Sequence, residues 1–464
     1  MNPYKFTQQL PNWDRRYLWH PFTQMKDWET TSPIIIEYGD GPYLIDTQGR
    51  RYLDGTSSLW VNVHGHRHPT IDQAIIHQLK KVAHTTLLGL SNPPAILLAR
   101  ELVRMAPTGL TRVFYSDDGS TAMEVALKMA IQYWRQRLPP KKRKTKFVHL
   151  VLSYHGDTIG GMSLGGVENF RAPFRSLLFK THRIDPPYCY RCPLHLKFPA
   201  CHFACLDALE SVLQKKNHEI AGVVLEPMMQ GVAGMIPSPP GYLTRVRKAC
   251  SKYQVLLIAD EVATGFGRTG RMFACQHESV TPDLMAVAKG LTGGYLPLAA
   301  TLATDEIYQA FLGKYEEWKT FFHGHSYTGN PLGCVAALAT IQIFKTERTL
   351  ATVKRRIVIL RRILDSLSHA PFVGDIRQCG LMVGIELVKD PVKKTPFPLT
   401  DQMGDRVAME ARKRGLMIRP IGNVLVLMPP LCSKTSHLKA MVSIVEQSLR
   451  CLADSLLNEG SLKQ

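Results

Sequence analysis

Two short apolar runs, each followed at once by charged side chains, limit most strongly what this chain can fold into. The run at residues 255–259 leads into Asp260 and Glu261. The run at residues 285–288 leads into Lys289 and a glycine-rich turn. Continuous apolar runs of this length are typical of strands that are buried on both faces of a parallel sheet. Open α/β sheets bind ligands at the carboxyl ends of such strands, so the pattern predicts that Asp260 and Lys289 meet at a binding site.

A lysine beside a carboxylate at such a site suits pyridoxal phosphate as the cofactor. The lysine provides the amine that attaches to the cofactor, and the acid keeps the ring nitrogen protonated so that the ring can withdraw electrons. The alternative is an unrelated surface pair beside a turn. We favour the cofactor site because an apolar run precedes both Asp260 and Lys289.

The wider pattern predicts an α/β fold with a second, smaller domain. Between residues 71 and 344, short apolar runs alternate with amphipathic stretches, which is typical of a large domain with a mostly parallel sheet. A long basic helix and two strand-like runs predict a smaller α+β domain at residues 345–464, and we expect residues 1–70 to pack with it. The strands expected in the large domain are residues 113–115, 147–152, 221–225, 255–259, 285–288 and 298–303.

The composition limits the class of protein without identifying it. The 464 residues are 45% hydrophobic and 20% charged, as in ordinary globular proteins. No apolar run approaches the roughly 18 residues of a membrane span, and the first residues lack the apolar core of a signal peptide. We therefore expect a cytoplasmic enzyme with no membrane partner.

The formal net charge of +19 raises the question of a nucleic-acid partner. The dense basic run covers only residues 141–146, and the other positive charges are scattered. No motif of a nucleic-acid-binding module is present. We interpret the basic run as a solvated loop and expect no nucleic acid as a partner.

Four of the ten cysteines form a cluster within a stretch that resembles an insertion, residues 182–206. Two closely spaced cysteine pairs are candidate zinc ligands. The pairs are closer together than in common zinc ribbons, so we favour the absence of a metal and keep zinc as an alternative. The four residues are Cys189, Cys192, Cys201 and Cys205.

Two other strand ends carry candidate cofactor residues. Gly119 and Ser120 begin an expected helix, where backbone N–H groups favour an anion such as phosphate. Thr121 with Glu124 fits a capping box, which alone could explain this helix start. Tyr154 follows another expected strand, where its ring can stack on a flat cofactor.

The segment at residues 265–270 has the GxGxxG spacing of dinucleotide-binding folds. That fingerprint requires a helix directly after it. Here Arg271, Phe273 and His277 follow in a loop-like run, so we exclude NAD.

Five segments together resemble those of the class III aminotransferases of fold type I, which use pyridoxal phosphate. They are IADEVATGFGRTG, AKGLTGG, DDGSTAMEVALKMA, YHGDT and FFHGHSYTGNPLG. The resemblance covers nearly the whole chain. It implies a pyridoxal-phosphate cofactor, a large domain with a seven-stranded type of sheet, and a homodimer whose active sites are shared between subunits.

Four further segments resemble a branch of this family that acts in biotin biosynthesis. They are WHPFTQM, DGTSSLWVNVHGHRHP, ALKMAIQYW and GLMIRPIGNVLVLMPP. The resemblance implies amino transfer to the ketone of 8-amino-7-oxononanoate, giving 7,8-diaminononanoate. The alternatives are another class III enzyme that uses ω-amino acids or diamines, and a regulator of the same fold without turnover. The presence of both Lys289 and Asp260 argues against the regulator.

The resemblance also implies roles for the residues around the cofactor. Lys289 would carry the cofactor and then move the proton, while Asp260 would pair with the ring nitrogen. Tyr154 would line the pocket beside the ring. The residues expected to hold the phosphate are Gly119 and Ser120, with His325 and Ser326 from the second subunit.

The substrate residues follow from the same resemblance. Gly324 and Arg419 would meet the acceptor, and Arg419 suits a bidentate pair with its carboxylate. The family's usual amino donor is S-adenosylmethionine, with a Tyr at the position of Phe22 and a Trp at that of Leu59. A related branch that resembles this chain at both positions takes L-lysine. We keep adenosylmethionine as the default donor and L-lysine as the alternative.

Overall fold

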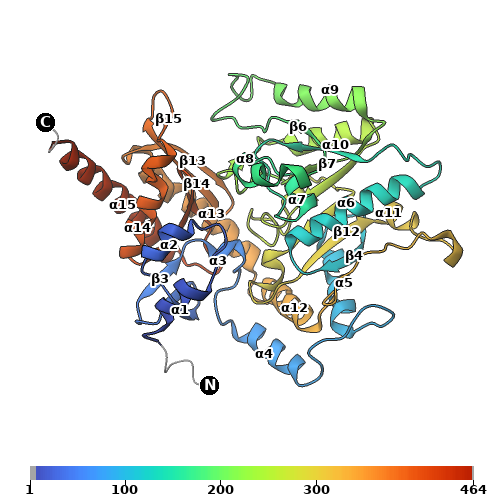
Figure 1. The fold of residues 1–464 in the computed structure, drawn as a ribbon, viewed down its shortest axis with the longest axis horizontal. Helices are drawn as coiled ribbons and strands as arrows, with labels where there is room; N and C mark the ends of the chain where they lie inside the picture. The colour runs from blue at the N-terminus through green and yellow to red at the C-terminus, as the bar shows by residue number, and fades with distance from the viewer. Residues whose placement is uncertain (1–6, 462–464) are drawn as a thin grey trace.

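The computed structural model describes residues 7–461, which form a larger body around one sheet and a smaller body beside it (Figure 1). The large sheet has seven strands in the order β4-β12-β11-β10-β7-β5-β6. Strand β10 lies parallel to β7 and β11, whereas β12 runs antiparallel to both of its neighbours. The expected mostly parallel sheet is therefore confirmed. Its strands are β4 (Leu110–Ser116), β5 (Lys146–Leu150), β6 (His182–Ile184), β7 (Ile220–Leu225), β10 (Leu256–Asp260), β11 (Leu284–Val287) and β12 (Ala299–Thr304).

The central strands of this sheet are buried on both faces. Every residue of β7, β10 and β11 is buried. Because successive side chains of a strand point to opposite faces, β10 contributes to two hydrophobic clusters. Leu257 and Ala259 belong to one cluster, and Leu256 and Ile258 belong to the other. This two-sided burial explains the uninterrupted apolar runs in the sequence.

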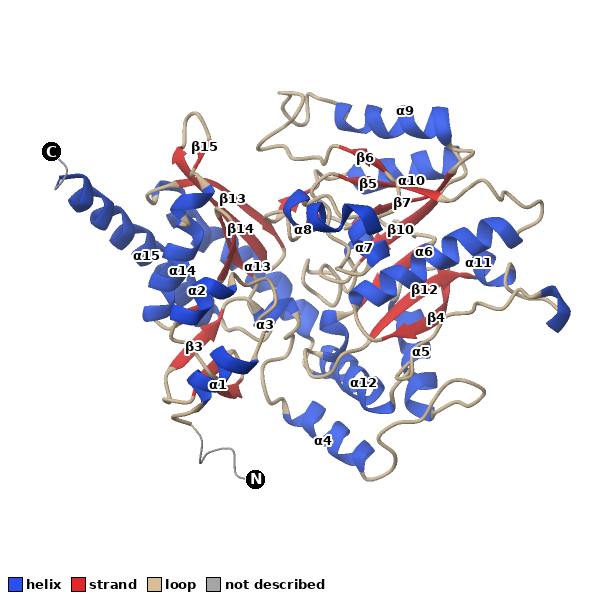
Figure 2. Cartoon of the chain, viewed as in Figure 1, coloured by secondary structure: helices blue, strands red, loops and turns tan. Residues whose placement is uncertain are grey.

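Helices pack around the large sheet (Figure 2). Helix α12 packs against both α4 and α5. Within residues 7–461, none of the helices has the length and apolar character that crossing a membrane requires. The helices are α4 (Pro69–Leu79), α5 (Pro93–Met105), α6 (Gly119–Gln136), α7 (Ile159–Ser163), α8 (Glu168–Arg171), α9 (Asp207–Lys216), α10 (Tyr242–Lys252), α11 (Asp305–Gln309) and α12 (Pro331–Thr346).

The smaller body contains an antiparallel sheet in the order β13-β14-β18-β17, with β15 paired to β14. Its strands are β13 (Val373–Cys379), β14 (Met382–Asp390), β15 (Thr395–Pro396), β17 (Arg419–Ile421) and β18 (Val424–Leu427). Its helices are α13 (Thr349–Leu364), α14 (Met403–Lys413) and α15 (Thr435–Ser461).

The N-terminal segment pairs with the C-terminal part of the chain. Strands β1, β2 and β3 form a sheet that β16 extends by lying parallel to β3. The domain limits at residues 70 and 344 stay predictions. The elements of this region are α1 (Leu10–Tyr17), α2 (Met25–Thr30), β1 (Ile36–Asp40), β2 (Tyr43–Asp46), β3 (Arg51–Asp54), α3 (Ser57–Trp60) and β16 (Leu416–Met417), and the short pair β8 (Met229–Gln230) and β9 (Ile236–Pro237) lies after β7.

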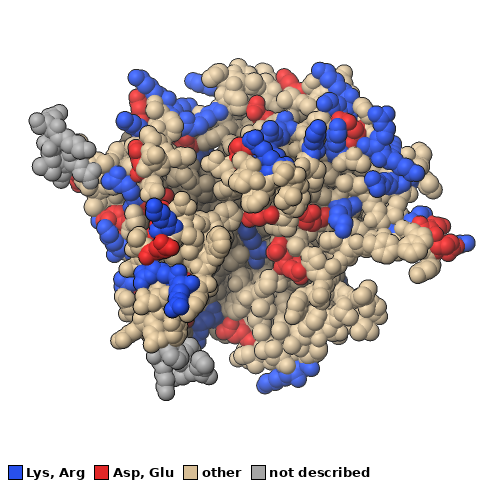
Figure 3. Space-filling model, in the orientation of Figure 1, with Lys and Arg blue, Asp and Glu red and all other residues tan. Residues whose placement is uncertain are grey.

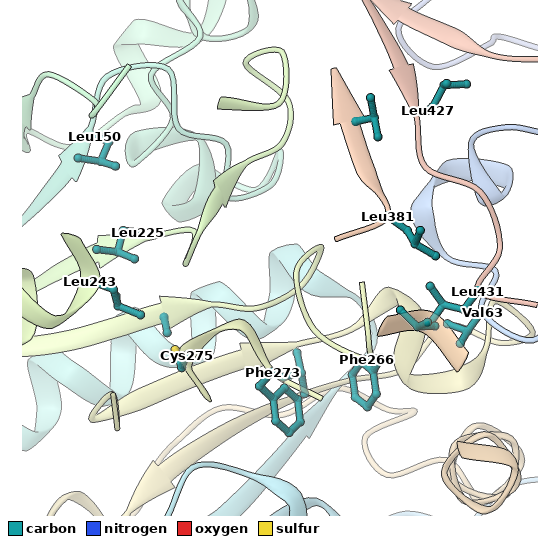
Figure 4. Packing of buried hydrophobic residues seen from close by; sticks show 14 of the residues in the cluster. Val63, Leu150, Leu225, Leu243, Phe266, Phe273, Cys275, Leu381, Leu427 and Leu431 are labelled. Carbon is teal, nitrogen blue, oxygen red and sulfur yellow. The ribbon is translucent and has the colours of Figure 1, made fainter. Parts of the chain in front are cut away.

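One hydrophobic cluster continues from the larger body into the smaller one. Figure 4 shows Leu225 and Leu243 on one side, and Leu381 and Leu427 on the other. All four residues are buried members of the same cluster. The two bodies are therefore packed against each other through a shared core.

Positive side chains are spread over the face shown in Figure 3, with acidic side chains among them. The basic run at residues 141–146 is less solvated than we expected. Lys144 is only 3% exposed, and its ammonium donates hydrogen bonds to the carbonyls of Ile220 at 3.0 Å and Gln254 at 2.9 Å. Burial lowers the pKa of Lys144 to about 8. The interpretation of this run as a solvated loop is therefore wrong for Lys144, which anchors the loop to the sheet.

Candidate active site

A cavity of about 1100 Å³ opens at the carboxyl ends of β7, β10 and β11. Its walls also include residues of the N-terminal segment and of β17. It therefore lies where open α/β sheets bind ligands. The predicted site residues that line it are Phe22, Leu59, Gly119, Ser120, Tyr154, Asp260, Lys289 and Arg419.

Lys289 follows β11 and starts a short 3-10 turn, η5 (Lys289–Thr292). Its φ of 45° lies in the left-handed region, which non-glycine residues rarely adopt. Residues with such a conformation are often found at functional sites. The amine lies 4.8 Å from the centre of the Trp60 ring. Burial lowers the pKa of Lys289, while Asp260 and Glu226 act in the opposite direction. A lowered pKa makes the neutral, nucleophilic amine easier to form.

Asp260 ends β10 and is held by two hydrogen bonds. One carboxylate oxygen accepts the Nδ1–H of His155 at 2.7 Å, and the other accepts the backbone N–H of Val262 at 3.0 Å. The other ring nitrogen of His155 is buried and has no hydrogen-bond partner among the residues that the structure describes. The sequence does not predict the pairing of His155 with Asp260, although His155 directly follows the predicted Tyr154.

Glu261 faces away from the cavity. Its carboxylate accepts hydrogen bonds from the hydroxyl of Thr264 at 2.7 Å and from the backbone N–H groups of Ala274 at 2.9 Å and Cys275 at 2.7 Å. Burial raises the pKa of Glu261. Because neighbouring side chains at a strand end point to opposite sides, Glu261 stabilises the loop after β10 while Asp260 faces the site.

Glu226 is a cavity residue that the sequence analysis missed. It follows β7 and is 8% exposed. One of its oxygens accepts the N–H of Tyr154 at 3.2 Å, and the other accepts the N–H of Gly231 at 2.8 Å. Burial raises the pKa of Glu226 to about 7. The signal was available, since Glu226 directly follows the apolar run at residues 221–225 just as Asp260 follows its own run.

The N-terminus of α6 reaches the cavity through Gly119 and Ser120. The capping box predicted between Thr121 and Glu124 is wrong. Asp118 caps the helix instead, with its carboxylate accepting the N–H of Thr121 at 2.9 Å. Glu124 accepts the N–H of Gly160, in α7, at 2.5 Å. The short Asp118 side chain fits the cap position, which frees Glu124 to join two helices.

The predicted residues Gly324, His325 and Ser326 lie outside the cavity of this chain. They belong to the loop before α12, where Gly324 and Ser326 are exposed. The Nδ1 atom of His325 lies 2.6 Å from a carboxylate oxygen of Asp117, which does line the cavity. That His325 and Ser326 serve a second subunit stays a prediction.

The outer wall of the cavity is largely apolar and comes from distant segments. Phe22 lies 5.3 Å from Phe170 between ring centres, and Phe170 lies 6.3 Å from Tyr154. Leu59 and Phe22 are each about half exposed. Arg419 begins β17, lines the cavity and is exposed. Phe170 was not predicted, because nothing in its local sequence marks it.

The four cysteines of the cluster are free thiols in the structure. Within residues 7–461, no group of three or more His, Cys, Asp or Glu side chains is arranged to hold a metal ion. Zinc binding by these cysteines therefore stays a prediction. The segment contacts the smaller body, because Tyr188 and Arg191 both donate to the carboxylate of Glu386 at 2.6 Å. The cysteines Cys189, Cys192, Cys201 and Cys205 line a separate cavity of about 20 Å³.

The GxGxxG spacing at residues 265–270 does not lead into an α-helix. The chain continues through turns to a short 3-10 helix, η4 (Ala274–His277). The strand–loop–helix context of a dinucleotide site is therefore missing here, as predicted.

Comparison with known proteins agrees with the geometry of this site. Residues 24–449 match the aminotransferase class-III family. An adenosylmethionine-8-amino-7-oxononanoate aminotransferase from Geobacter sulfurreducens is 50% identical over 96% of this chain and 98% of that protein. A protein of the same name from Staphylococcus aureus is 46% identical over 97% of this chain and 99% of its own length.

Solved structures show the same similarity. The adenosylmethionine-8-amino-7-oxononanoate aminotransferase from Methanocaldococcus jannaschii matches with a TM-score of 0.91 and 46% identity, over 96% of this chain and 99% of that chain. A PLP-bound amine transaminase from an uncultivated Pseudomonas species matches with a TM-score of 0.88 and 35% identity, over 94% and 98% respectively. Sequence, fold and cavity thus agree that the chain belongs to the aminotransferase class-III family.

Proposed function

We propose that this protein is a pyridoxal-phosphate-dependent aminotransferase that converts 8-amino-7-oxononanoate to 7,8-diaminononanoate. The meeting of Lys289 and Asp260 in one cavity carries the proposal. Relatives that match over nearly their whole length are named for amino transfer involving this acceptor. The class III resemblance of the sequence motifs is confirmed.

The cavity has the groups and the space that pyridoxal phosphate requires. Its volume of about 1100 Å³ exceeds that of most pockets for one small ligand, so a cofactor and a substrate fit together. The N–H groups at the start of α6 suit the phosphate. Gly156 leaves room beside Ser120 at the start of α6, since a Cβ on Gly156 would lie 2.2 Å from the hydroxyl oxygen of Ser120. The residues present therefore fit the cofactor.

Each residue around the cofactor has a proposed task. Bound pyridoxal phosphate supplies an electron sink when a proton leaves the carbon that carries the amino group. Lys289 would hold the cofactor, and its released Nζ would take that proton and return it at the cofactor carbon bonded to the same nitrogen. Asp260, oriented by His155, would accept a hydrogen bond from the ring nitrogen and favour its protonated form. Tyr154 would line the pocket beside the ring.

We propose Arg419 as the residue that binds the carboxylate of the acceptor. Its guanidinium lies at the mouth of the cavity, and a planar guanidinium can donate two parallel hydrogen bonds to a carboxylate. Arg419 also acts on Asp405: burial raises the pKa of Asp405, and the charge of Arg419 acts in the opposite direction. The acceptor's methylene chain would then lie along the apolar wall.

The amino donor is S-adenosylmethionine by the family default, with L-lysine as the alternative. The Phe22 and Leu59 side chains line the cavity, so both can contact a donor. Compared with Tyr and Trp at these positions, they remove a hydroxyl and a flat indole. A narrower, more apolar wall suits the methylene stem of lysine, whereas adenine binds better to flat aromatic faces.

We also propose a homodimer in which His325 and Ser326 complete the active site of the other subunit. Large apolar side chains are exposed along the loop before α12, among them Trp318, Phe322 and Tyr327. An exposed apolar surface of this kind is typical of a subunit contact. Mixing inactive Lys289→Ala subunits with His325→Ala subunits should restore activity, because one site per mixed dimer is then intact. No restoration in verified mixed dimers would contradict shared sites.

The test of the function is a half-reaction screen. The protein is loaded with pyridoxal phosphate, candidate amines are added, and conversion to the amino form of the cofactor is followed by absorbance. We expect conversion by adenosylmethionine or L-lysine, and return of the starting spectrum with 8-amino-7-oxononanoate. Lys289→Ala should lose both changes. Faster reaction with 4-aminobutyrate, ornithine or a polyamine would favour another class III activity instead.

A further inference from the structure

A buried carboxylate with no task in the mechanism above forms part of the cavity wall. Glu226 is 8% exposed and directly follows β7, beside Asp260 at the end of the neighbouring strand β10. Burial of a carboxylate costs free energy unless hydrogen bonds or charges compensate it. Its place in the wall therefore needs a physical reason.

Glu226 joins two backbone segments that approach the cavity from different directions. It accepts the N–H of Tyr154, on the loop after β5, at 3.2 Å and the N–H of Gly231, in the turn after β8, at 2.8 Å. The Gly231 turn packs on Trp60, since a Cβ on Gly231 would lie 3.1 Å from the indole ring. The ring of Trp60 in turn faces the amine of Lys289. One side chain thus fixes the backbone behind both aromatic residues.

The charges around Glu226 come from three other segments. His155 faces it from the loop after β5, Asp260 from β10 and Lys289 from the turn after β11. Burial raises the pKa of Glu226, Asp260 acts in the same direction and His155 opposes both. For Lys289, burial and Arg268 lower the pKa, whereas Asp260 and Glu226 raise it. A negative charge on Glu226 therefore favours the protonated amine.

We propose that Glu226 is a positioning residue of this active site, which holds the backbones of Tyr154 and Gly231 and whose negative charge favours protonation at Lys289 Nζ. Glu226 acts through these groups and needs no contact with either substrate. The inference rests on the proposed function, because its test uses the absorbance of pyridoxal phosphate bound at Lys289.

The experiment is a pH titration of that absorbance in the cofactor-loaded wild type and three variants. Glu226→Gln removes the charge but keeps the size, so the apparent pKa of the absorbance change should fall by about one pH unit. Glu226→Asp keeps the charge and should restore the value to within about half a unit of wild type. Glu261→Gln is the matched control, because Glu261 is an equally buried carboxylate that faces away from the cavity. It should leave the apparent pKa unchanged.

Each outcome decides the matter. An unchanged apparent pKa in cofactor-loaded Glu226→Gln overturns the inference, and so does an equal shift in Glu261→Gln, which would indicate a general loss of structure. If Glu226→Gln does not fold, Glu226→Asp carries the test, and a fall of about one full unit in that variant overturns the inference. Absence of the absorbance from wild type would instead refute the proposed function, so the two failures are distinguishable.

Discussion

Replacing Arg419 by alanine should impair the reaction with the acceptor far more than the reaction with the donor. Arg419 is exposed at the cavity wall, where its guanidinium is free to meet a carboxylate. A charge-assisted hydrogen-bonded contact contributes about 1.5–3 kcal/mol, and solvent exposure moves the value to the lower end of that range. A loss of about 1.4 kcal/mol corresponds to a tenfold change in affinity. We therefore expect the KM of the acceptor to rise about tenfold.

Stopped-flow absorbance measures the two half-reactions separately, which makes the expectation specific. The donor half-reaction should keep its rate and its concentration dependence. Arg414→Ala is the control, because Arg414 pairs with Glu410 on α14 and does not line the cavity. It should leave both half-reactions unchanged. Equal damage to both half-reactions in Arg419→Ala would refute the reasoning and show that Arg419 supports the structure of β17.

Three further changes should have measurable effects. Gly156→Ala should weaken pyridoxal phosphate binding about tenfold or more in a fluorescence titration, because Gly156 has a φ of 107° and the new Cβ would meet Ser120. An unchanged affinity would contradict the proposal that the phosphate binds at the start of α6. The double change Phe22→Tyr with Leu59→Trp should raise the kcat/KM for adenosylmethionine about tenfold relative to the kcat/KM for L-lysine, since each aromatic contact contributes roughly 0.5–1.5 kcal/mol. An unchanged ratio of the two kcat/KM values would show that Phe22 and Leu59 do not discriminate between donors. The raised pKa of Glu226 stabilises the folded protein fully below pH 4.5, and this stabilisation is lost as the pH rises through about 7. The melting temperature of Glu226→Gln minus that of wild type should therefore increase from pH 5 to pH 8. A difference that stays constant over this pH range would contradict the prediction.

The strands of the large sheet could be predicted from the sequence where burial on both faces requires an uninterrupted run of apolar residues. The runs that become β7, β10 and β11 are apolar throughout because both faces are covered. The direction of β12 could not be predicted in this way. A buried strand has the same apolar pattern in either direction, and only its pairing with β4 and β11 shows that it is antiparallel.

The presence of Asp260 and Lys289 in one cavity could be predicted, because each directly follows an apolar run that becomes a strand. The same rule applies to Glu226, which was missed because a carboxylate after a strand is not by itself a known cofactor ligand. The different orientations of Asp260 and Glu261 could not be read from the sequence. Alternation places the two side chains on opposite sides, but only the fold shows which side holds the cavity. His155 likewise needs the approach of two distant strand ends to reach Asp260.

The proposed substrate residues reach the cavity through pairing between the two ends of the chain. Strand β3 pairs with β16, with Leu53 opposite Leu416 and Asp54 opposite Met417. Leu59 lies just after β3 and Arg419 just after β16, so this pairing brings the proposed donor residue Leu59 and the proposed acceptor residue Arg419 to the same cavity. The large sheet holds the residues proposed to react with the cofactor, and the terminal pairing holds those proposed to meet substrates. Substitutions in the terminal pairing should therefore change which amines react without changing how the cofactor is bound.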